Sequence, residues 1–230
     1  MCHADYTTQD YLSLDGQIQH KLAYISDYIP AGKRLILIGH SIGCYVILKM
    51  LSNDTDNSLD HHDVAKCYLL FPTIERIARS PNGQFFTPLL KYFSWMIPLI
   101  TLPLLFLPYQ IKRFFVEKFF GVGQVPQCAV DATIKLLSPS SCRNSLYLTN
   151  IEMQSVCSLD TETISKNIER LCFYYGTNDA WCPVEYHHTM KQLFPTGKIY
   201  LCSRDIEHAF VLKHSKEMAS IVSDWLQSVV

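Results

Sequence analysis

Ser41, Asp179 and His208 are residues whose types and order in the chain could carry out acyl transfer. Ser41 lies at the centre of Gly39-His40-Ser41-Ile42-Gly43, a G-x-S-x-G pattern. An apolar run at 35–38 precedes this pattern, and a helical stretch at 44–51 follows it. The pattern therefore predicts a serine nucleophile at a sharp strand-to-helix turn. We expect glycines two positions on either side because a side chain at either position would clash with neighbouring backbone.

A serine hydroxyl is a weak nucleophile near neutral pH, so an imidazole must accept its proton and a carboxylate must orient that imidazole. In an open α/β sheet these groups lie where the strands end. His208 follows the apolar run 198–202 and is the expected base, while Asp179 follows 171–175 and is the expected acid. The order Ser, Asp, His is typical of one large hydrolase fold. The weaker candidates are Asp205, His214, His187, His188, His61, His62 and His40, whose side chain we expect to point away from the serine.

The backbone N–H of Ile42 is the expected first donor to an oxyanion, because it directly follows the nucleophile. Only about 40 residues precede Ser41, and they contain one predicted helix (9–29) and one strand (34–38). No glycine-rich loop in those residues could supply a second donor, and losing one such donor costs roughly 10²–10³ in rate. We therefore expect a chain truncated on its N-terminal side, with weak or absent hydrolysis and an exposed sheet edge.

The surrounding elements are predicted to alternate between strand and helix. Further strands are expected at 67–71, 171–175 and 198–202, with helices at 184–194 and at the C-terminus. This alternation predicts a parallel α/β sheet. The expected core comprises 1–79 and 166–230, with a helical cap inserted at 80–165.

Composition narrows the possible partners and cofactors. The net charge of −1 gives no electrostatic reason for a nucleic-acid partner. The nine cysteines contain no C-x-x-C pair, so we expect reduced, buried thiols in a cytosol-facing protein and no zinc site. A calcium loop at 54–65 is rejected, since Leu59 and Ala65 replace its glycine and glutamate. We expect no cofactor and no metal.

The segment 92–111 contains no charged residue and three prolines. It is long enough to span a bilayer, but prolines argue against a straight spanning helix. Lysine and arginine flank it, and IKRFFVEKFF then mixes basic and aromatic residues, as segments lying on a membrane surface do. Three hypotheses remain for 85–120: a lid over a lipid-binding cleft, a shallow insertion into a lipid monolayer, and a packed cap without lipid contact.

Nearly the whole chain resembles the lipid droplet-associated hydrolase family, a branch of the α/β-hydrolases. The matching stretches are LDGQIQHKLAYI, LILIGHSIGCY, LLFPTIERIARSPNGQ, FYYGTNDAWCP and EHAF around His208. The resemblance implies an α/β-hydrolase fold and a serine esterase or lipase for neutral lipid esters, cholesteryl ester in particular. It also implies residence at lipid droplets or the cytosolic face of the endoplasmic reticulum, with Ser41, Asp179 and His208 as the triad and a lipid-facing role for 85–120.

Two other functions remain open from the sequence. One is a droplet-surface scaffold that keeps the hydrolase fold without its chemistry, for which the uncharged, proline-rich stretch argues. The other is a different hydrolase reaction, such as thioester or peptide cleavage, because a triad alone does not specify the leaving group.

Overall fold

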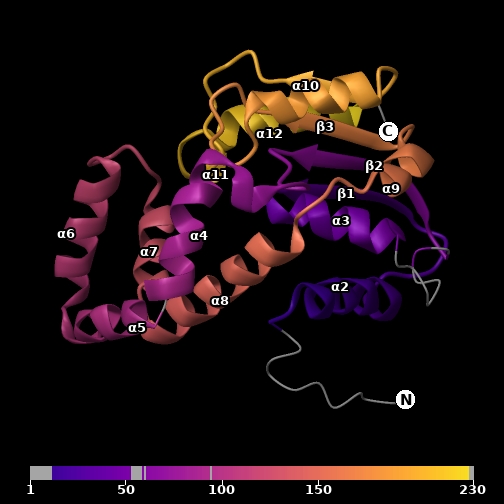
Figure 1. The fold of residues 1–230 in the computed structure, drawn as a ribbon. Helices are drawn as coiled ribbons and strands as arrows, with labels where there is room; N and C mark the ends of the chain where they lie inside the picture. The colour runs from indigo at the N-terminus through magenta and orange to yellow at the C-terminus, as the bar shows by residue number, and fades with distance from the viewer. Residues whose placement is uncertain (1–11, 53–58, 60, 94, 228–230) are drawn as a thin grey trace. The chain divides into compact units, whose positions relative to one another are not determined.

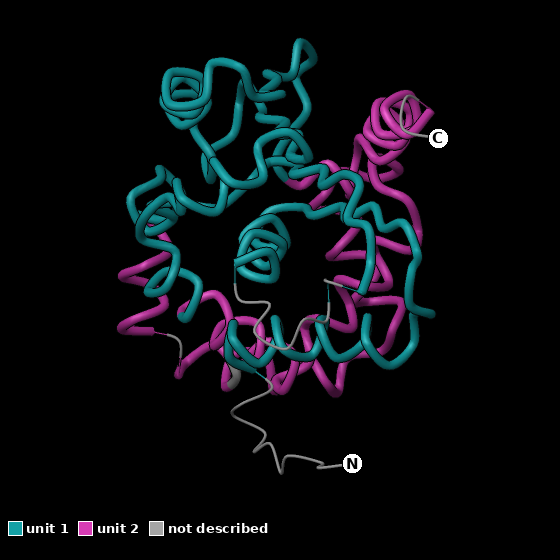
Figure 2. Tube along the Cα trace, turned by 90° about the vertical axis from the view of Figure 1, so that its right-hand side faces the viewer, with its two compact units in different colours: residues 1–84, 151–208, 229 teal, residues 85–150, 209–228, 230 magenta. Residues whose placement is uncertain are grey.

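The computed structural model describes residues 12–52, 59, 61–93 and 95–227. Contacts between Cα atoms divide the chain into two compact units (Figure 2). Unit 1 contains residues 1–84, 151–208 and 229, and unit 2 contains residues 85–150, 209–228 and 230. Half of the segment 54–65, for which a calcium loop was rejected, lies at 54–58 and 60, outside the described residues.

Unit 1 is built on a sheet of four parallel strands in the order β1-β2-β3-β4. The strands are β1 (Arg34–His40), β2 (Asp63–Leu70), β3 (Leu171–Tyr175) and β4 (Lys198–Leu201). β3 is buried at every position because both faces of the sheet are covered. Strand β2 begins four residues before its predicted start, since Asp63 to Lys66 pair with the first half of β1. The predicted parallel α/β sheet is confirmed.

Helices cover both faces of this sheet (Figure 1). One face carries α3 (Ile42–Ser52) and α9 (Thr161–Asn167), and α2 (Leu14–Tyr28) packs against α3. The opposite face carries α10 (Val184–Leu193). Helix α2 begins where Ser13 accepts a hydrogen bond from the Gly16 N–H at 2.9 Å, and its apolar positions Ile18, Leu22 and Ile25 enter the core. These helices bury the apolar strands that place the loops at the carboxyl end of the sheet.

Strand β1 lies at one edge of the sheet. Within the described residues it pairs with β2 alone, and Ile38 is 49% exposed. An edge strand presents backbone N–H and C=O groups on its open side. Within the described residues β1 is therefore an edge strand, and the expectation of a truncated chain stays a prediction.

Unit 2 is helical. It contains α5 (Met96–Thr101), the 3₁₀-helix η2 (Leu102–Phe106), α6 (Tyr109–Phe120) and α7 (Gln127–Leu136). The helices α11 (Phe210–Lys213) and α12 (Ser215–Gln227) also belong to it. The proline-rich stretch thus forms short helices and not one straight helix, against which its prolines argued. In the part of the chain that the structure describes, no helix has both the length and the apolar character needed to cross a membrane.

Two helices pass from one unit to the other. The boundaries fall within α4 (Pro81–Phe93) and α8 (Pro139–Ser155) rather than at the expected positions 80 and 165. The first turn of α4 belongs to unit 1, where Asn82 donates its N–H to the Ala180 carbonyl at 3.0 Å. Just before it, η1 (Ile77–Arg79) is held where Ile77 donates its N–H to the Val156 carbonyl at 3.2 Å. These bonds lie within unit 1, whereas residues 209–228, expected in the core, group with unit 2.

The described cysteines carry free thiols. Cys44, Cys67, Cys172, Cys182 and Cys202 are buried, while Cys128 and Cys157 are exposed. The expectation of buried, reduced thiols therefore holds for the sheet and its helices, where cysteine packs as a small apolar side chain.

Candidate active site

Ser41 occupies the turn between β1 and α3 in a conformation that few residues adopt. Its φ is 56°, in the left-handed region, and its N–H donates to the Leu70 carbonyl at 3.0 Å. The Cys44 thiol, in the first turn of α3, donates to the carbonyls of Gly39 and Leu70. These bonds tie the strained turn to the end of the neighbouring strand, so the serine is held in position by the sheet.

The two glycines of the motif differ in what they allow. A Cβ at Gly39 would lie 2.8 Å from the backbone carbon and oxygen of Gly43 and 2.8 Å from the Ile47 Cδ1 atom. A Cβ at Gly43 would meet no atom within 4 Å. The expectation of a steric need at both positions is therefore wrong for Gly43. The close approach is made by the Gly43 backbone against the Gly39 Cα, so only Gly39 must lack a side chain.

The structure brings Ser41, His208 and Asp179 into one hydrogen-bonded line. The Ser41 Oγ and the His208 Nε2 lie 2.8 Å apart, and the His208 Nδ1 lies 2.7 Å from the Asp179 Oδ2. Each residue follows a different strand: Ser41 directly follows β1, Asp179 lies four residues beyond β3, and His208 lies in the loop beyond β4. With the proton on Nδ1, the other ring nitrogen can accept the serine proton.

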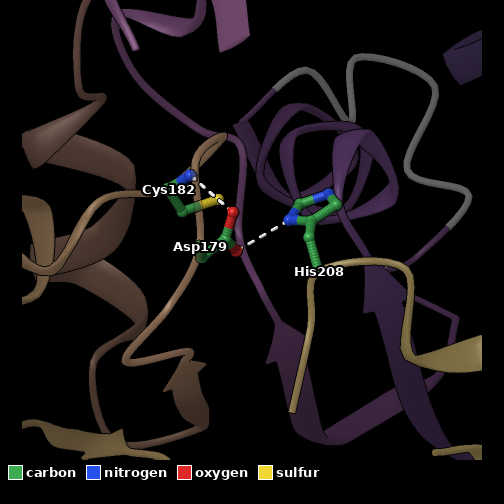
Figure 3. A group of neighbouring side chains, drawn as sticks. All are labelled: Asp179, Cys182 and His208. Carbon is green, nitrogen blue, oxygen red and sulfur yellow. Dashed lines mark hydrogen bonds and ion pairs between the residues drawn. The ribbon is translucent and has the colours of Figure 1, made fainter. Parts of the chain in front are cut away.

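Asp179 is held by the loop that carries it. Its Oδ1 accepts the backbone N–H groups of Trp181 at 2.7 Å and Cys182 at 3.0 Å. This leaves Oδ2 for His208, and Figure 3 shows the bonds of Asp179 to Cys182 and His208. Its side chain has no exposed surface. Burial by itself raises the pKa of Asp179, but the hydrogen bond and charge of His208 and the two N–H donors outweigh it, so the pKa is lowered. The carboxylate is therefore ionised at neutral pH.

Cys182 adds a third potential metal ligand next to this pair (Figure 3). Ligand atoms of Asp179, Cys182 and His208 lie within 4.8 Å of one another. Each is already engaged, because the Cys182 thiol donates to the Phe71 carbonyl at 3.3 Å and both Asp179 oxygens accept hydrogen bonds. Burial also raises the pKa of Cys182, which keeps the thiol protonated. The arrangement fits a hydrogen-bonded acid–base pair better than a metal site.

His40, whose side chain was expected to point away from Ser41, contacts the main chain of the expected base. Its Nε2 lies 2.8 Å from the main-chain oxygen of His208, to which the ring N–H donates. The two imidazole centroids are 5.2 Å apart, and Phe71 packs edge-on against both rings. Burial lowers the pKa of His40 despite the bond to His208, so the ring is neutral at pH 7. In the sequence, His40 stands out only because it directly precedes Ser41. Its bond to the His208 carbonyl becomes visible once the loop beyond β4 is folded.

The weaker candidates occupy other positions. Asp205 is exposed, and the His214 Nδ1 lies 4.0 Å from a carboxylate oxygen of Glu217 in the first turn of α12. The His187 ring packs edge-on against Tyr175. Of the candidate bases within the described residues, His208 is the one that forms a hydrogen bond with the Ser41 hydroxyl.

Ile42 is the first residue of α3. The N–H groups of a first helical turn have no acceptor within the helix and carry the positive end of its dipole. The Ile42 N–H therefore suits an oxyanion next to Ser41, and this role stays a prediction.

A parallel α/β sheet with a serine on a strained strand-to-helix turn, and an Asp–His pair on later loops, defines an α/β-hydrolase. Solved structures share this fold at low sequence identity. A carboxylesterase of Nitrososphaera gargenis matches with a TM-score of 0.60 and 12% identity over 94% of this chain and 72% of its own. An α/β-fold hydrolase of Bacillus anthracis matches with a TM-score of 0.56 and 13% identity over 97% and 78% of the two chains.

The chain belongs to the lipid droplet-associated hydrolase family. The family model, described as lipid-droplet associated hydrolase, matches residues 2–211. The lipid droplet-associated hydrolases of Gallus gallus and Mus musculus are 39% and 40% identical over 95% and 96% of this chain. That of Drosophila melanogaster is 37% identical over 95% of this chain and 70% of its own length. The chain spans 66% of the length of the chicken and mouse proteins.

Proposed function

We propose that this protein is a serine hydrolase that cleaves neutral lipid esters, cholesteryl esters among them, by way of an acyl-enzyme. The observation that carries the proposal is the line from Ser41 Oγ through His208 to Asp179, with distances of 2.8 and 2.7 Å. Membership of the family supports hydrolysis. The proposed cellular location is the lipid droplet, because the relatives are named for droplets. The cytosolic face of the endoplasmic reticulum is a second proposed location.

In the proposed reaction, the Ser41 oxygen attacks the ester carbonyl while the His208 Nε2 accepts its proton. The Asp179 carboxylate stabilises the resulting imidazolium, and the Ile42 N–H faces the developing oxyanion. His208 then protonates the leaving alcohol, which departs and leaves the acyl group on Ser41. Water, deprotonated by His208, attacks this acyl-enzyme and releases the fatty acid.

The proposal is tested by labelling with a fluorophosphonate, which reacts with activated serines. We expect the purified chain to be labelled and Ser41→Ala to abolish labelling. The matched control is Ser80→Ala, which changes a buried serine whose hydroxyl caps α4 through the Gly83 N–H at 3.0 Å. Labelling that persists in Ser41→Ala, or that is equally lost in Ser80→Ala while the protein remains folded, contradicts the assignment.

A second candidate function is a droplet-surface scaffold attached through 85–120. Several large apolar side chains of this segment are strongly exposed, among them Phe106 and Phe119 at 83% and Trp95 at 66%. Keeping apolar side-chain surface in contact with water is unfavourable by roughly 25 cal/mol of free energy for each Å². Burial of these side chains in a lipid monolayer would recover that cost, which supports surface binding.

Flotation with artificial triacylglycerol droplets separates the two functions. We expect the parent chain to float, the triple variant Trp95→Ser, Phe106→Ser, Phe119→Ser to remain in solution, and Ser41→Ala to float like the parent. A triple variant that still floats places the attachment elsewhere in the chain. A parent that floats but is never labelled by fluorophosphonate favours the scaffold.

A further inference from the structure

Helix α6 and its neighbours in unit 2 form a groove that the proposed catalytic steps do not use. It has a volume of about 520 Å³, within the range of small-molecule sites. The α6 residues that line it are Lys112, Phe115, Val116 and Phe119, whose spacing of three, four and seven places them on one helix face. Val116 is 6% exposed and forms the floor. The groove therefore reaches inward to Val116, while Phe119, which also lines it, is 83% exposed.

The other walls come from residues before and after α6. These are Leu104 of η2, Leu107, Thr133 of α7 and Leu137. The Thr133 hydroxyl already donates to the Ala129 carbonyl at 2.8 Å. Among the described lining residues, Lys112 supplies the single charged group.

In the part of the helical unit that the structure describes, the acidic side chains are engaged by groups other than Lys112. Residues 85–150 contain six lysines and arginines but only two acids, Glu117 and Asp131. Glu117 pairs with the Arg113 Nε at 2.7 Å, and Asp131 accepts hydrogen bonds from Tyr109 and Gln127. Within the described part of the chain, no ion pair involves Lys112, which is half-buried beside apolar walls. An anionic group there would meet a positive charge whose attraction is stronger beside apolar walls than in bulk water.

We propose that this groove binds a long-chain fatty acid, with the acyl chain along the apolar walls and the carboxylate at Lys112. The groove supplies one charge of the required sign beside an apolar cavity sized for a single chain. The choice of a carboxylate over a phosphate head rests on the proposed function, because ester hydrolysis releases a fatty acid. The bound species is then the product of the same enzyme, retained in its helical unit.

The experiment measures binding directly and is independent of catalysis, because every variant also carries Ser41→Ala. A fluorescent fatty acid, 11-(dansylamino)undecanoate, is displaced from the full chain by laurate, dodecyl phosphate or dodecyltrimethylammonium, each below its micelle concentration. These three competitors share a twelve-carbon chain and differ in their heads. We expect one site per chain, displacement by laurate at least as strong as by dodecyl phosphate, and weak displacement by the cationic amphiphile.

Charge reversal on α6 provides the matched pair. Lys112→Glu should weaken laurate by about tenfold and strengthen the cationic competitor, because an attraction becomes a repulsion in a partly screened site. Lys118→Glu makes the same change in net charge at an exposed position of α6 that does not line the groove, and should alter either affinity by less than about twofold. Lys112→Met removes the charge without reversal and should give an intermediate loss.

Three results would overturn the proposal. Equal effects of Lys112→Glu and Lys118→Glu would show bulk electrostatic attraction rather than a site. Many fatty acids per chain, with no effect of Leu107→Trp, which fills the groove, would show adsorption to exposed apolar surface. A clear preference for dodecyl phosphate would assign the groove to a phosphate head. Because the experiment measures binding and no turnover, each of these outcomes can be interpreted even if the triad is inactive.

Discussion

Replacing the acid of the triad by its amide tests whether the Asp179 loop controls the tautomer of His208. In Asp179→Asn, the side-chain oxygen must face the N–H groups of Trp181 and Cys182, which donate to Oδ1 in the parent at 2.7 and 3.0 Å. The opposite orientation would set an NH₂ group against two donors and lose both bonds, at about 1 kcal/mol or more each. The amide NH₂ therefore faces His208 and donates to Nδ1. This forces the ring proton onto Nε2, where it faces the serine.

With a proton on Nε2, His208 cannot accept the proton of Ser41. The same substitution in a serine protease lowers kcat by about 10⁴, close to 5.5 kcal/mol of transition-state stabilisation. We expect a loss of this order here, because the His208 Nδ1 lies 2.7 Å from the Asp179 Oδ2 and the amide orientation is enforced by two donors. The fold should persist, since shape and volume are unchanged.

The assay is the rate of fluorophosphonate labelling, together with hydrolysis of a short-chain p-nitrophenyl ester. Asp205→Asn is the control, because it makes the same chemical change at an exposed position in the loop that carries His208. It should retain the parent rate within about twofold. An Asp179→Asn protein that labels within about tenfold of the parent would refute the reasoning, as would equal losses in the two variants.

Three further predictions follow from the turn and its neighbours. His40→Phe removes the donor to the His208 carbonyl and should lower kcat by about tenfold with little change in KM. His40→Gln can still donate and should recover part of the loss. If His40→Phe and the parent have equal kcat, this bond is not needed. Gly39→Ala should lower the free energy of unfolding in urea by about 1–3 kcal/mol, because its Cβ would meet the Gly43 backbone at 2.8 Å. Gly43→Ala should change that free energy by less than about 1 kcal/mol. A larger loss of stability in Gly43→Ala than in Gly39→Ala would contradict the steric argument. Because folding lowers the pKa of Asp179 from 3.8, its ionisation stabilises the protein above pH 3.8, and this contribution disappears as the pH falls through the lowered pKa. The difference in urea midpoint between the parent and Asp179→Asn should therefore narrow below pH 3.8. A difference that stays constant with pH would exclude this linkage.

Local pattern was sufficient for the elements that carry the site. Strand β3 has the predicted limits, and β1 and β4 differ from prediction by two residues or fewer at their ends, because buried parallel strands are short apolar runs bounded by turns. The same reasoning placed Asp179 and His208 at strand ends, where loops of a parallel sheet converge. The limits of the helical segment were less predictable, because hydrogen bonds such as that from Asn82 to Ala180 join residues distant in the chain.

By itself, the sequence determined the type of chemistry: a serine on a strand-to-helix turn, an acid and a base in order, and membership of a family that resembles this chain throughout. These follow from local spacing, which short-range sterics and periodicity translate into structure. Tertiary structure alone decided that His40 bonds to the carbonyl of His208, that Gly39 but not Gly43 must lack a side chain, and that Lys112 lies beside an apolar groove. The His40 bond joins elements far apart in the chain, and no local pattern encodes a distance between such elements. The difference between Gly39 and Gly43 arises within one turn, where it depends on the exact backbone path that the G-x-S-x-G pattern does not specify.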